Sequence, residues 1–192
     1  VTHTYYLNAD STVSLGNHTV YQQEDRTVSW LTVGSTWYLV DAETGELLSG
    51  WQKVDTATYY MKPGSFDANG DMKDGSFEME TGNQKNKSGW AEIDGKWYSF
   101  RSWGGMYRST FFKAPTGSAL YYADENGKMA VGKKQIDGDW YYFKDWGGMY
   151  QNAFIKNGTS VCHAAADGKL TVGWLQQGST YYYFDETGEQ YF

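Results

Sequence analysis

The sequence predicts an all-β protein built as a solenoid of stacked β-hairpins. Aromatic residues make up 18% of the 192 residues, although the mean hydropathy is only −0.66. The chain also has 23 glycines and 2 prolines, and aromatic residues with many glycines favour short strands joined by tight turns. In addition, near-copies of one phrase recur along the chain. Regular repetition is typical of solenoids, in which each unit packs on its neighbours.

The clearest repetition is that of "WYSFRSWGGMY", residues 97–107, and "WYYFKDWGGMY", residues 140–150. Trp97 and Trp140 are 43 residues apart, as are Trp103 and Trp146. Each copy contains a smaller unit, about 20 residues long, with an aromatic strand, a turn containing Asp or Asn and Gly, and a short strand with Met or Leu. We therefore expect hairpins of about 20 residues, paired in a 43-residue super-repeat.

The turn glycines follow one another at steps of 23, 20, 21 and 20 residues, at Gly104, Gly127, Gly147, Gly168 and Gly188. Asp or Asn opens a tight turn by bonding its own backbone, and Gly supplies the positive φ that such a turn requires. We expect each of these glycines to close a hairpin. Because an isolated two-stranded hairpin is marginally stable, successive hairpins must bury their aromatic faces against each other.

We expect one continuous repeat domain with four parts. Residues 1–36 form a degenerate repeat, because Ser11 stands where the turn glycine would fall. Residues 37–72 form repeat hairpins. Residues 73–88 are an inserted loop or a degenerate hairpin, since Gly70 and Gly104 are 34 residues apart. Residues 89–192 form regular repeat hairpins.

Charge and composition exclude several classes of partner. The formal net charge is −7 and no basic run occurs, so nucleic acid is not an expected partner. No stretch approaches the roughly 18–20 consecutive apolar residues of a membrane span, and residues 1–12 lack the pattern of a signal peptide. With one cysteine, Cys162, an internal disulfide is impossible. We expect a part of a larger multidomain protein whose signal peptide is missing from this sequence.

The repeats resemble a known family. The phrases "GWAEIDGKWYSFRSWGGM" (89–106) and "GKKQIDGDWYYFKDWGGM" (132–149) are similar to the cell-wall-binding repeats of Gram-positive surface proteins, which include choline-binding and glucan-binding types. The resemblance implies a left-handed helical stack of hairpins with ligand pockets between successive hairpins. It also implies a secreted or cell-surface location and a binding module without catalytic residues.

Two hairpins depart from the family pattern. In the units that follow the two "WGGMY" phrases, the expected Gly-Trp is replaced by Ser109-Thr110 and Asn152-Ala153, followed by Phe111 and Phe154. The hairpins are therefore expected to alternate between two types, with sites at every second junction.

The resemblance implies that a pocket is lined by the Trp of Gly-Trp, by aromatic residues of the following strand, and by a ring of the next hairpin. Mapped onto this sequence, the expected groups are Trp51 with Tyr59 and Tyr60, Trp90 with Trp97 and Tyr98, Trp140 with Tyr141, and Trp174 with Tyr181 and Tyr182. Polar residues follow the Trp position in three units: Gln52 and Lys53, Lys134 and Gln135 at the matching place of another unit, and Gln176 with Gln177.

The ligand depends on what surrounds the rings. A box made only of aromatic rings suits a quaternary ammonium such as choline, whereas one or two rings flanked by amide and charged groups suit a sugar. Because Lys beside a ring repels choline, these neighbours favour a polysaccharide, an α-glucan or a cell-wall glycan. Three alternatives stay open: choline on teichoic acid, a protein-binding adhesin, and Gln and Lys that only decorate an exposed strand.

Trp103 and Trp146 stand in turns, where Asn or Asp is usual and a large ring has few neighbours. One hypothesis is a stacking platform for the ligand, joined by Tyr107 and Tyr150 and by neighbouring charged residues (Arg101, Arg108, Lys144 and Asp145). The alternative is that each indole folds back as a cover over the adjacent hairpin.

Other chemistry has weaker support in the sequence. Asp67, Asn69, Asp71 and Glu78 match positions of a calcium loop, but Met72 replaces its required Gly, and the same residues fit a hairpin turn. Cys162-His163 takes the place of Tyr-Tyr in its repeat, and paired catalytic carboxylates are not expected in a linear stack. We expect no catalytic residue, no metal and no cofactor.

Overall fold

The computed structural model describes residues 6–7, 13–14, 19–69, 71–81, 89–114 and 117–191. In this part of the chain the regular elements are all β-strands, which confirms the all-β prediction. Some expected features lie outside the described residues, namely the turn at Ser11, the glycine at position 70 and residues 82–88 of the expected insertion.

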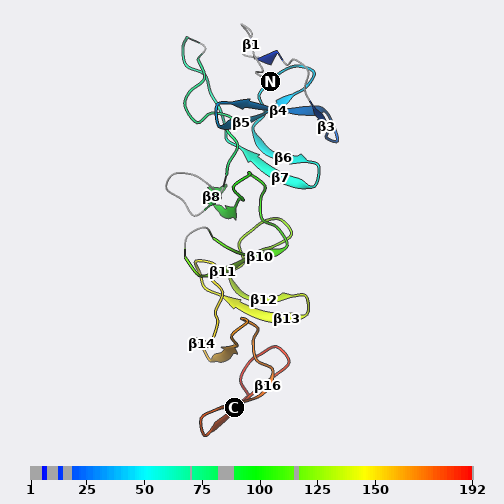
Figure 1. The fold of residues 1–192 in the computed structure, drawn as a ribbon. Coiled ribbons are helices and arrows are strands. Elements are labelled where there is room, and N and C mark those ends of the chain that lie inside the picture. Colours follow the sequence, from blue (N-terminus) through cyan, green and yellow to red (C-terminus); the bar gives the residue numbers. More distant parts are fainter. Residues whose placement is uncertain are drawn as a thin grey trace. The chain divides into compact units, whose positions relative to one another are not determined.

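The strands are short and follow one another as pairs along the chain (Figure 1). In chain order they are β1 Tyr6–Leu7, β2 Val13–Ser14, β3 Val20–Gln22, β4 Thr27–Val33, β5 Thr36–Asp41, β6 Gly50–Val54, β7 Ala57–Met61, β8 Trp90–Ile93, β9 Lys96–Ser99, β10 Thr110–Lys113, β11 Leu120–Ala123, β12 Gly132–Ile136, β13 Asp139–Phe143, β14 Ala153–Asn157, β15 Ser160–Ala164, β16 Gly173–Gln177 and β17 Thr180–Phe184. Consecutive strands pair in two-stranded sheets, except for the three-stranded sheet β3-β4-β5.

The chain divides into two compact units, residues 1–91 with 100–106, and residues 92–99 with 107–192. Within each unit, one backbone hydrogen bond links each hairpin to the preceding one. In the first unit, Met79 N donates to Trp37 O over 2.9 Å, and in the second, Met149 N donates to Leu120 O over 2.7 Å. The same bond recurs from Met106 to Thr58, from Met129 to Trp97, from Leu170 to Trp140 and from Gln190 to Val161. This linkage between nearest neighbours is that of a solenoid of stacked hairpins.

The turns that join the paired strands differ from the expected ones. Asp137 and Gly138 join β12 to β13 with φ values of 51° and 90°, as in a tight type I′ hairpin. The turn at Gly127 instead follows the second strand of its hairpin. It brings Met129 back beside the end of that strand, where Met129 and Ala123 form an isolated β-bridge. The prediction that Gly104, Gly127, Gly147, Gly168 and Gly188 close the main hairpins is therefore wrong. Both kinds of turn need Asp and Gly, so composition does not distinguish them.

Four of those glycines, at positions 104, 147, 168 and 188, are nevertheless required by packing. Gly147 has a φ of 86°, and a Cβ there would lie 2.2 Å from the sulfur of Met129. Met129 therefore packs directly on the turn backbone of the next hairpin. The same close approach recurs from Met79 to Gly104, from Met149 to Gly168 and from Leu170 to Gly188. The regular spacing of these glycines in the sequence therefore reflects a contact that neighbouring hairpins repeat.

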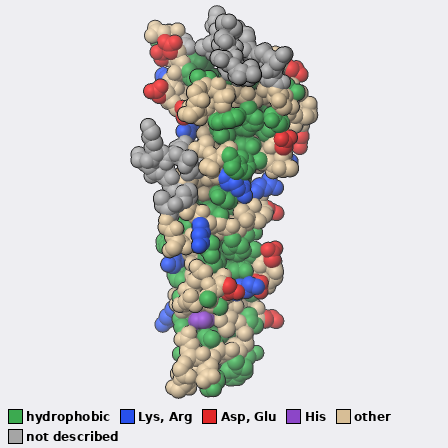
Figure 2. Space-filling model, viewed as in Figure 1, with side chains coloured by type: hydrophobic (Ala, Val, Ile, Leu, Met, Phe, Trp, Pro, Cys, Tyr) green, Lys and Arg blue, Asp and Glu red, His purple; other side chains and the backbone are tan. Residues whose placement is uncertain are grey.

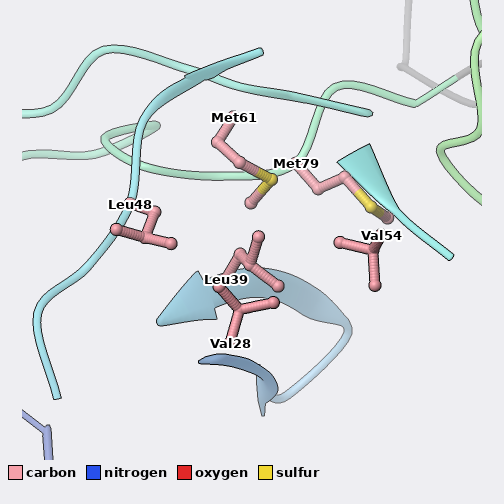
Figure 3. Packing of buried hydrophobic residues seen from close by; sticks show 6 residues of the cluster. All are labelled: Val28, Leu39, Leu48, Val54, Met61 and Met79. Carbon is pink, nitrogen blue, oxygen red and sulfur yellow. The ribbon is translucent and has the colours of Figure 1, made fainter. Parts of the chain in front are cut away.

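The core of each unit is narrow. In the second unit Phe143 and Phe184, which end strands β13 and β17, are 1% and 0% exposed. In the first unit the buried side chains are largely aliphatic. Figure 3 shows six of them packed together, from strands β4 to β7 and the segments that follow β5 and β7: Val28, Leu39, Leu48, Val54, Met61 and Met79. Many of the Trp and Tyr rings thus remain available at the surface.

One turn of the first unit is enlarged. In a regular repeat, five residues separate the last strand residue Phe143 from its bridge partner Met149. Met61 instead bridges to Met79, with residues 62–78 between them. This excursion contains a small turn of its own, closed by the bridge from Phe66 to Met72. The extra residues therefore begin before residue 73, where the sequence analysis placed the start of the insertion.

Two types of hairpin alternate, as predicted. The carbonyl that accepts the linking hydrogen bond belongs to Trp37 on β5, Trp97 on β9 and Trp140 on β13. In the hairpins between and after them, the same position holds smaller residues, Thr58, Leu120 and Val161. A Trp at this position therefore recurs at every second hairpin.

A change in pH is expected to test the Asp-Gly turns. Asp185 Oδ1 accepts hydrogen bonds from the backbone N–H groups of Glu189 and Thr187, and the Glu189 bond is the main cause that lowers the pKa of Asp185. A lowered folded pKa stabilises the protein above the unfolded pKa of about 3.9, and this stabilisation is lost as the pH falls. Asp185→Asn keeps the acceptor without the charge. The stability difference between wild type and D185N, measured by urea unfolding, should shrink from pH 7 to pH 3, and a constant difference would contradict this account.

Candidate ligand-binding site

Five aromatic rings, including that of Tyr21, line a hollow of about 610 Å³ in the first unit. Trp30 comes from β4, Trp37 from β5, Tyr59 from β7, and Trp103 from the turn after β9. We call this site the Trp103 hollow. Its lining is completed by Tyr21, Ser35, Met79, Thr81 and Ser102.

The rings stand at steep angles to one another. The centroids of Trp30 and Trp37 are 6.0 Å apart with 81° between the planes, and those of Trp30 and Tyr59 are 4.8 Å apart at 69°. Tyr59 and Trp103 are 6.0 Å apart at 66°. Rings set in this way form adjoining walls instead of a closed stack, so the arrangement can enclose a small group.

The second glycine of the Trp103 turn determines where its indole lies. A Cβ on Gly105 would lie 2.0 Å from the indole of Trp103, so the ring rests on the bare backbone of that glycine. The side chain is nevertheless 52% exposed. The indole thus folds back on its own turn, lies beside Tyr59 of the preceding hairpin, and still presents a large accessible surface.

Among the residues that the structure describes, no side chain lining the Trp103 hollow carries a charge at neutral pH. Burial is the main cause that raises the pKa of the Tyr59 phenol, with smaller contributions from Asp55 and Tyr21, so this phenol stays protonated. The guanidinium of Arg101 lies 5.5 Å from the centre of the Trp103 ring. The Trp103 ring thus already attracts the Arg101 guanidinium, whose positive charge lies beside the hollow.

The second unit contains a related arrangement, which we call the Trp146 cluster: Trp97, Tyr121, Met129 and Trp146. Tyr121 and Trp146 are 6.0 Å apart at 66°, the same geometry as Tyr59 and Trp103, and the N–H of Met129 donates to Trp97 O over 3.2 Å. Trp97 and Trp146 are 45% and 54% exposed. The second copy of the 43-residue repeat thus reproduces this part of the first site.

A lysine lies between the Trp146 ring of this cluster and the ring of Tyr150. The Nζ of Lys144 lies 5.0 Å from the centre of the Trp146 ring and 5.1 Å from that of Tyr150. The structure thus brings together two residues that the sequence analysis proposed, Trp146 and Tyr150, through a cation. By contrast, Tyr107 stacks on Phe112 with centroids 4.3 Å apart.

A second hollow in the first unit, of about 510 Å³, is polar. Trp51 is its one ring among the described lining residues, and the rest carry amide, carboxylate or cationic groups: Gln22, Gln23, Glu24, Asp25, Arg26, Gln52, Lys53 and Asp55. The Nε2 of Gln52 donates to Ser49 O over 2.9 Å, and its Oε1 accepts from Gln23 Nε2 over 3.2 Å. We call this site the Trp51 hollow.

The other proposed Gln residues bond their own hairpin turns. The Nε2 of Gln135 donates to Gly138 O over 3.3 Å, and that of Gln176 donates to Gly178 O over 3.2 Å. Lys134 and Gln135 also line an open polar hollow of about 460 Å³ beside Tyr122 and Asp124. These contacts favour the interpretation in which Gln135 and Gln176 support turns at the surface of a strand.

Alternation of side chains along a strand separates several expected pairs. Trp51 packs on Tyr60, with centroids 4.9 Å apart, whereas Tyr59 belongs to the Trp103 hollow. Similarly, Trp174 packs on Tyr183 at 5.1 Å, and Tyr182 packs on Phe154 at 5.0 Å instead. Trp90 begins β8, on the strand that pairs with the strand of Trp97, and Trp140 is approached by Lys133.

Sequence reasoning missed Trp30, Trp37 and Tyr21. A signal was present, because Trp30 precedes Trp37 by seven residues, as Trp90 precedes Trp97. The excursion at residues 62–78 lengthens this repeat and so obscures its match with the later copies.

Metal and cysteine chemistry have little support in the described part of the chain. Asp67 Oδ1 accepts from the N–H groups of Asn69 and Asp71, and Glu78 forms an ion pair with Lys62, which agrees with the hairpin-turn interpretation. No cluster of His, Cys, Asp and Glu that could hold a metal occurs among the described residues. Cys162 is buried, and burial is the main cause that raises the pKa of its thiol.

Gly148→Ala is expected to displace the Trp146 indole. Gly148 does not have a positive φ, so its backbone accepts Ala, but a Cβ would lie 2.1 Å from the ring. In NMR spectra of the nine indole N–H groups, the signal of Trp146 should shift strongly while that of Trp103 stays in place. Gly105→Ala is the matched control, with the reverse result. Unchanged Trp146 signals in G148A would show that the ring does not rest on this glycine.

Comparisons with known proteins agree with these features. The family model of the cell wall binding repeat matches residues 88–106, 134–149 and 172–189, and no curated protein matches the chain. The structure of CbpJ from Streptococcus pneumoniae TIGR4 is similar with a TM-score of 0.71 and 25% identity, over 97% of this chain and 56% of CbpJ. Choline binding protein F from Streptococcus pneumoniae has a TM-score of 0.62 and 22% identity, over 97% of this chain and 69% of that protein.

The chain thus spans little more than half the length of CbpJ. In the part of the chain that the structure describes, no helix is long and apolar enough to cross a membrane. The matched segments contain Trp103, Trp146 and Trp174, whereas Trp30, Trp37 and Tyr59 of the Trp103 hollow lie outside them. These three segments are therefore similar to the cell wall binding repeat.

Proposed function

We propose that this chain is a noncatalytic anchor that binds quaternary ammonium groups, such as the choline of a bacterial cell wall polymer, in the Trp103 hollow. The observation that carries this proposal is the set of five rings around a hollow whose described lining has no charged side chain. These rings are Tyr21, Trp30, Trp37, Tyr59 and Trp103. A hollow lined by aromatic rings without charged groups suits a cation that cannot donate hydrogen bonds.

The strength of a single site follows from the ring contacts. Each well-placed ring contributes about 1–2 kcal/mol to the binding of a desolvated cation, and association itself costs several kcal/mol. One site would therefore bind with a Kd of about 1 mM, near −4 kcal/mol. The Trp146 cluster supplies further rings, and two sites on one polymer raise the apparent affinity through effective concentration.

The likeness to choline binding protein F supports the same ligand class, because that protein is named for choline. Cell wall binding repeats belong to surface proteins, so we place the parent protein outside the cell, secreted or on the surface of a Gram-positive bacterium. The activity of any further domain of the parent protein would be separate from this module.

A polysaccharide is the second candidate ligand, supported by the Trp51 hollow. There, one ring is flanked by amides, carboxylates and cations, which are the partners that sugar hydroxyl groups need. Since the Gln52 amide already bonds Ser49 and Gln23, a sugar would have to share these groups. We therefore rank the glycan site below the ammonium site, and a protein-binding adhesin below both.

A retention experiment distinguishes the candidates. The protein is applied to a choline-coupled resin and, in parallel, to insoluble dextran, starch and purified cell wall. Retention on choline and on cell wall, with elution by millimolar choline and not by glucose oligomers, is the expected result. Binding to dextran or starch that choline does not reverse would favour the Trp51 hollow and a glycan. No retention on any of these supports would contradict both proposals and favour the adhesin.

A further inference from the structure

The second unit contains, on β13, a third Trp at the strand position that Trp37 and Trp97 occupy in the earlier copies of the repeat. Trp140 corresponds to Trp37 and Trp97, because its carbonyl accepts the linking hydrogen bond from Leu170 in the same way. Seven residues before Trp37 and Trp97 stand Trp30 and Trp90, whereas the residue seven before Trp140 is Lys133. A cationic side chain therefore replaces a ring in this copy.

The ammonium of Lys133 is held by three groups of the second unit. Its Nζ lies 5.0 Å from the centre of the Trp140 ring, and it donates to Thr187 Oγ1 over 3.1 Å and to Glu189 Oε1 over 2.8 Å. The side chain is only 19% exposed. Its bond to Glu189 is the main cause that lowers the pKa of that carboxyl.

The acceptors lie where the earlier copies place their turn residues. The turn 185–190 corresponds to the turns 101–106 and 144–149, so Thr187 stands at the position of Trp103 and Trp146, and Glu189 at that of Gly105 and Gly148. The third copy has thus lost its turn indole and the glycine under it. It has acquired a carboxylate at the same place, and a carboxylate attracts cations.

We propose that the Lys133 ammonium is the built-in occupant of this third ring site and keeps it closed to external cations. An ammonium on the same chain competes at a high effective concentration, so a weak external ligand does not displace it. Trp140 supplies the ring and Glu189 the counter-charge that an external cation would otherwise use. The residue seven positions before the strand Trp therefore decides whether a copy of the repeat is open or closed. This inference rests on the proposed function only for the identity of the external ligand.

Removal of the lysine should open the site. Lys133→Ala deletes the ammonium and leaves Trp140, Thr187 and Glu189 in place. In titrations with tetramethylammonium chloride at constant ionic strength, followed by calorimetry, K133A should bind one more cation per chain than wild type. Lys133→Arg keeps a cation and should bind the same number as wild type. The double variant K133A/W140A should lose the additional site. If K133A does not fold, Lys133→Gln tests the same expectation with a neutral stem of similar length.

The possible outcomes separate the two proposals. One extra site in K133A supports the inference whether or not wild type binds the probe. An unchanged number in a folded K133A overturns it, even if wild type binds and the proposed function stands. A second readout needs no ligand, because the Trp140 ring should shift the ε-methylene protons of Lys133 upfield in NMR spectra, and W140A should abolish that shift. Protons at the position of a solvated lysine in wild type would also overturn the inference.

Discussion

Replacing Trp103 with alanine is expected to weaken binding of choline to the Trp103 hollow roughly 5- to 30-fold, because one good ring contributes about 1–2 kcal/mol to cation binding. Trp103 lies in a turn and is 52% exposed, so its loss should change the free energy of unfolding by less than about 1 kcal/mol. Calorimetric titration gives the affinity, and urea unfolding of the same samples gives the stability.

Trp174→Ala is the matched control for this variant. Trp174 is 74% exposed and packs on a single ring, that of Tyr183, outside the Trp103 hollow. W174A should bind choline at the Trp103 hollow as wild type does. Equal losses in both variants would mean that exposed indoles bind the ligand without a built site, and full binding by W103A would remove this residue from the site.

Replacing Phe143 with alanine is expected to lower the free energy of unfolding by about 3–5 kcal/mol, as for other fully buried Phe residues. Phe143 is 1% exposed, ends β13, and bridges to Met149. In a stack where each hairpin contacts only its neighbours, such a cavity removes the interface on which the next hairpin depends. Urea unfolding should therefore show a lower midpoint, and hydrogen exchange should be faster in β12 to β15 first.

The comparison for Phe143→Ala is Val172→Ala. Val172 is 56% exposed and should cost less than about 0.5 kcal/mol. A similar, small loss in both variants would contradict the view that the buried Phe residues carry the stability of the second unit.

The sequence predicted the alternation of the hairpins correctly, but it did not predict which turns join the paired strands. The 43-residue spacing of Trp97 and Trp140 predicted the alternation that the hydrogen bonds of Met129 and Leu170 confirm. The prediction failed at Gly127 and its equivalents, because two successive Asp-Gly turns have the same composition. Only strand pairing distinguishes the turn that joins the two strands of a hairpin from the turn that follows the second strand and leads to its bridge partner, such as Met129.

The site was harder to predict because it depends on side-chain direction and on distant segments. Tyr59 and Tyr60 are neighbours in the sequence, yet they face different partners, Trp103 and Trp51. Trp30 and Trp103 are 73 residues apart and line one hollow. Hydrophobic side chains reach the surface in many places (Figure 2), and exposed Trp side chains occur in both units. Exposure alone therefore does not identify the ring sets that can act together.

Contacts between choline and the rings provide the most direct test of the account. In isotope-filtered NMR spectra of labelled protein with unlabelled choline, the N-methyl protons should show NOEs to ring protons of Trp30, Trp37, Tyr59 and Trp103. At the same choline concentration, the NOEs to Trp30, Trp37 and Tyr59 should be weaker in W103A. NOEs confined to Trp51, or none at choline concentrations well above 1 mM with folded protein, would contradict it.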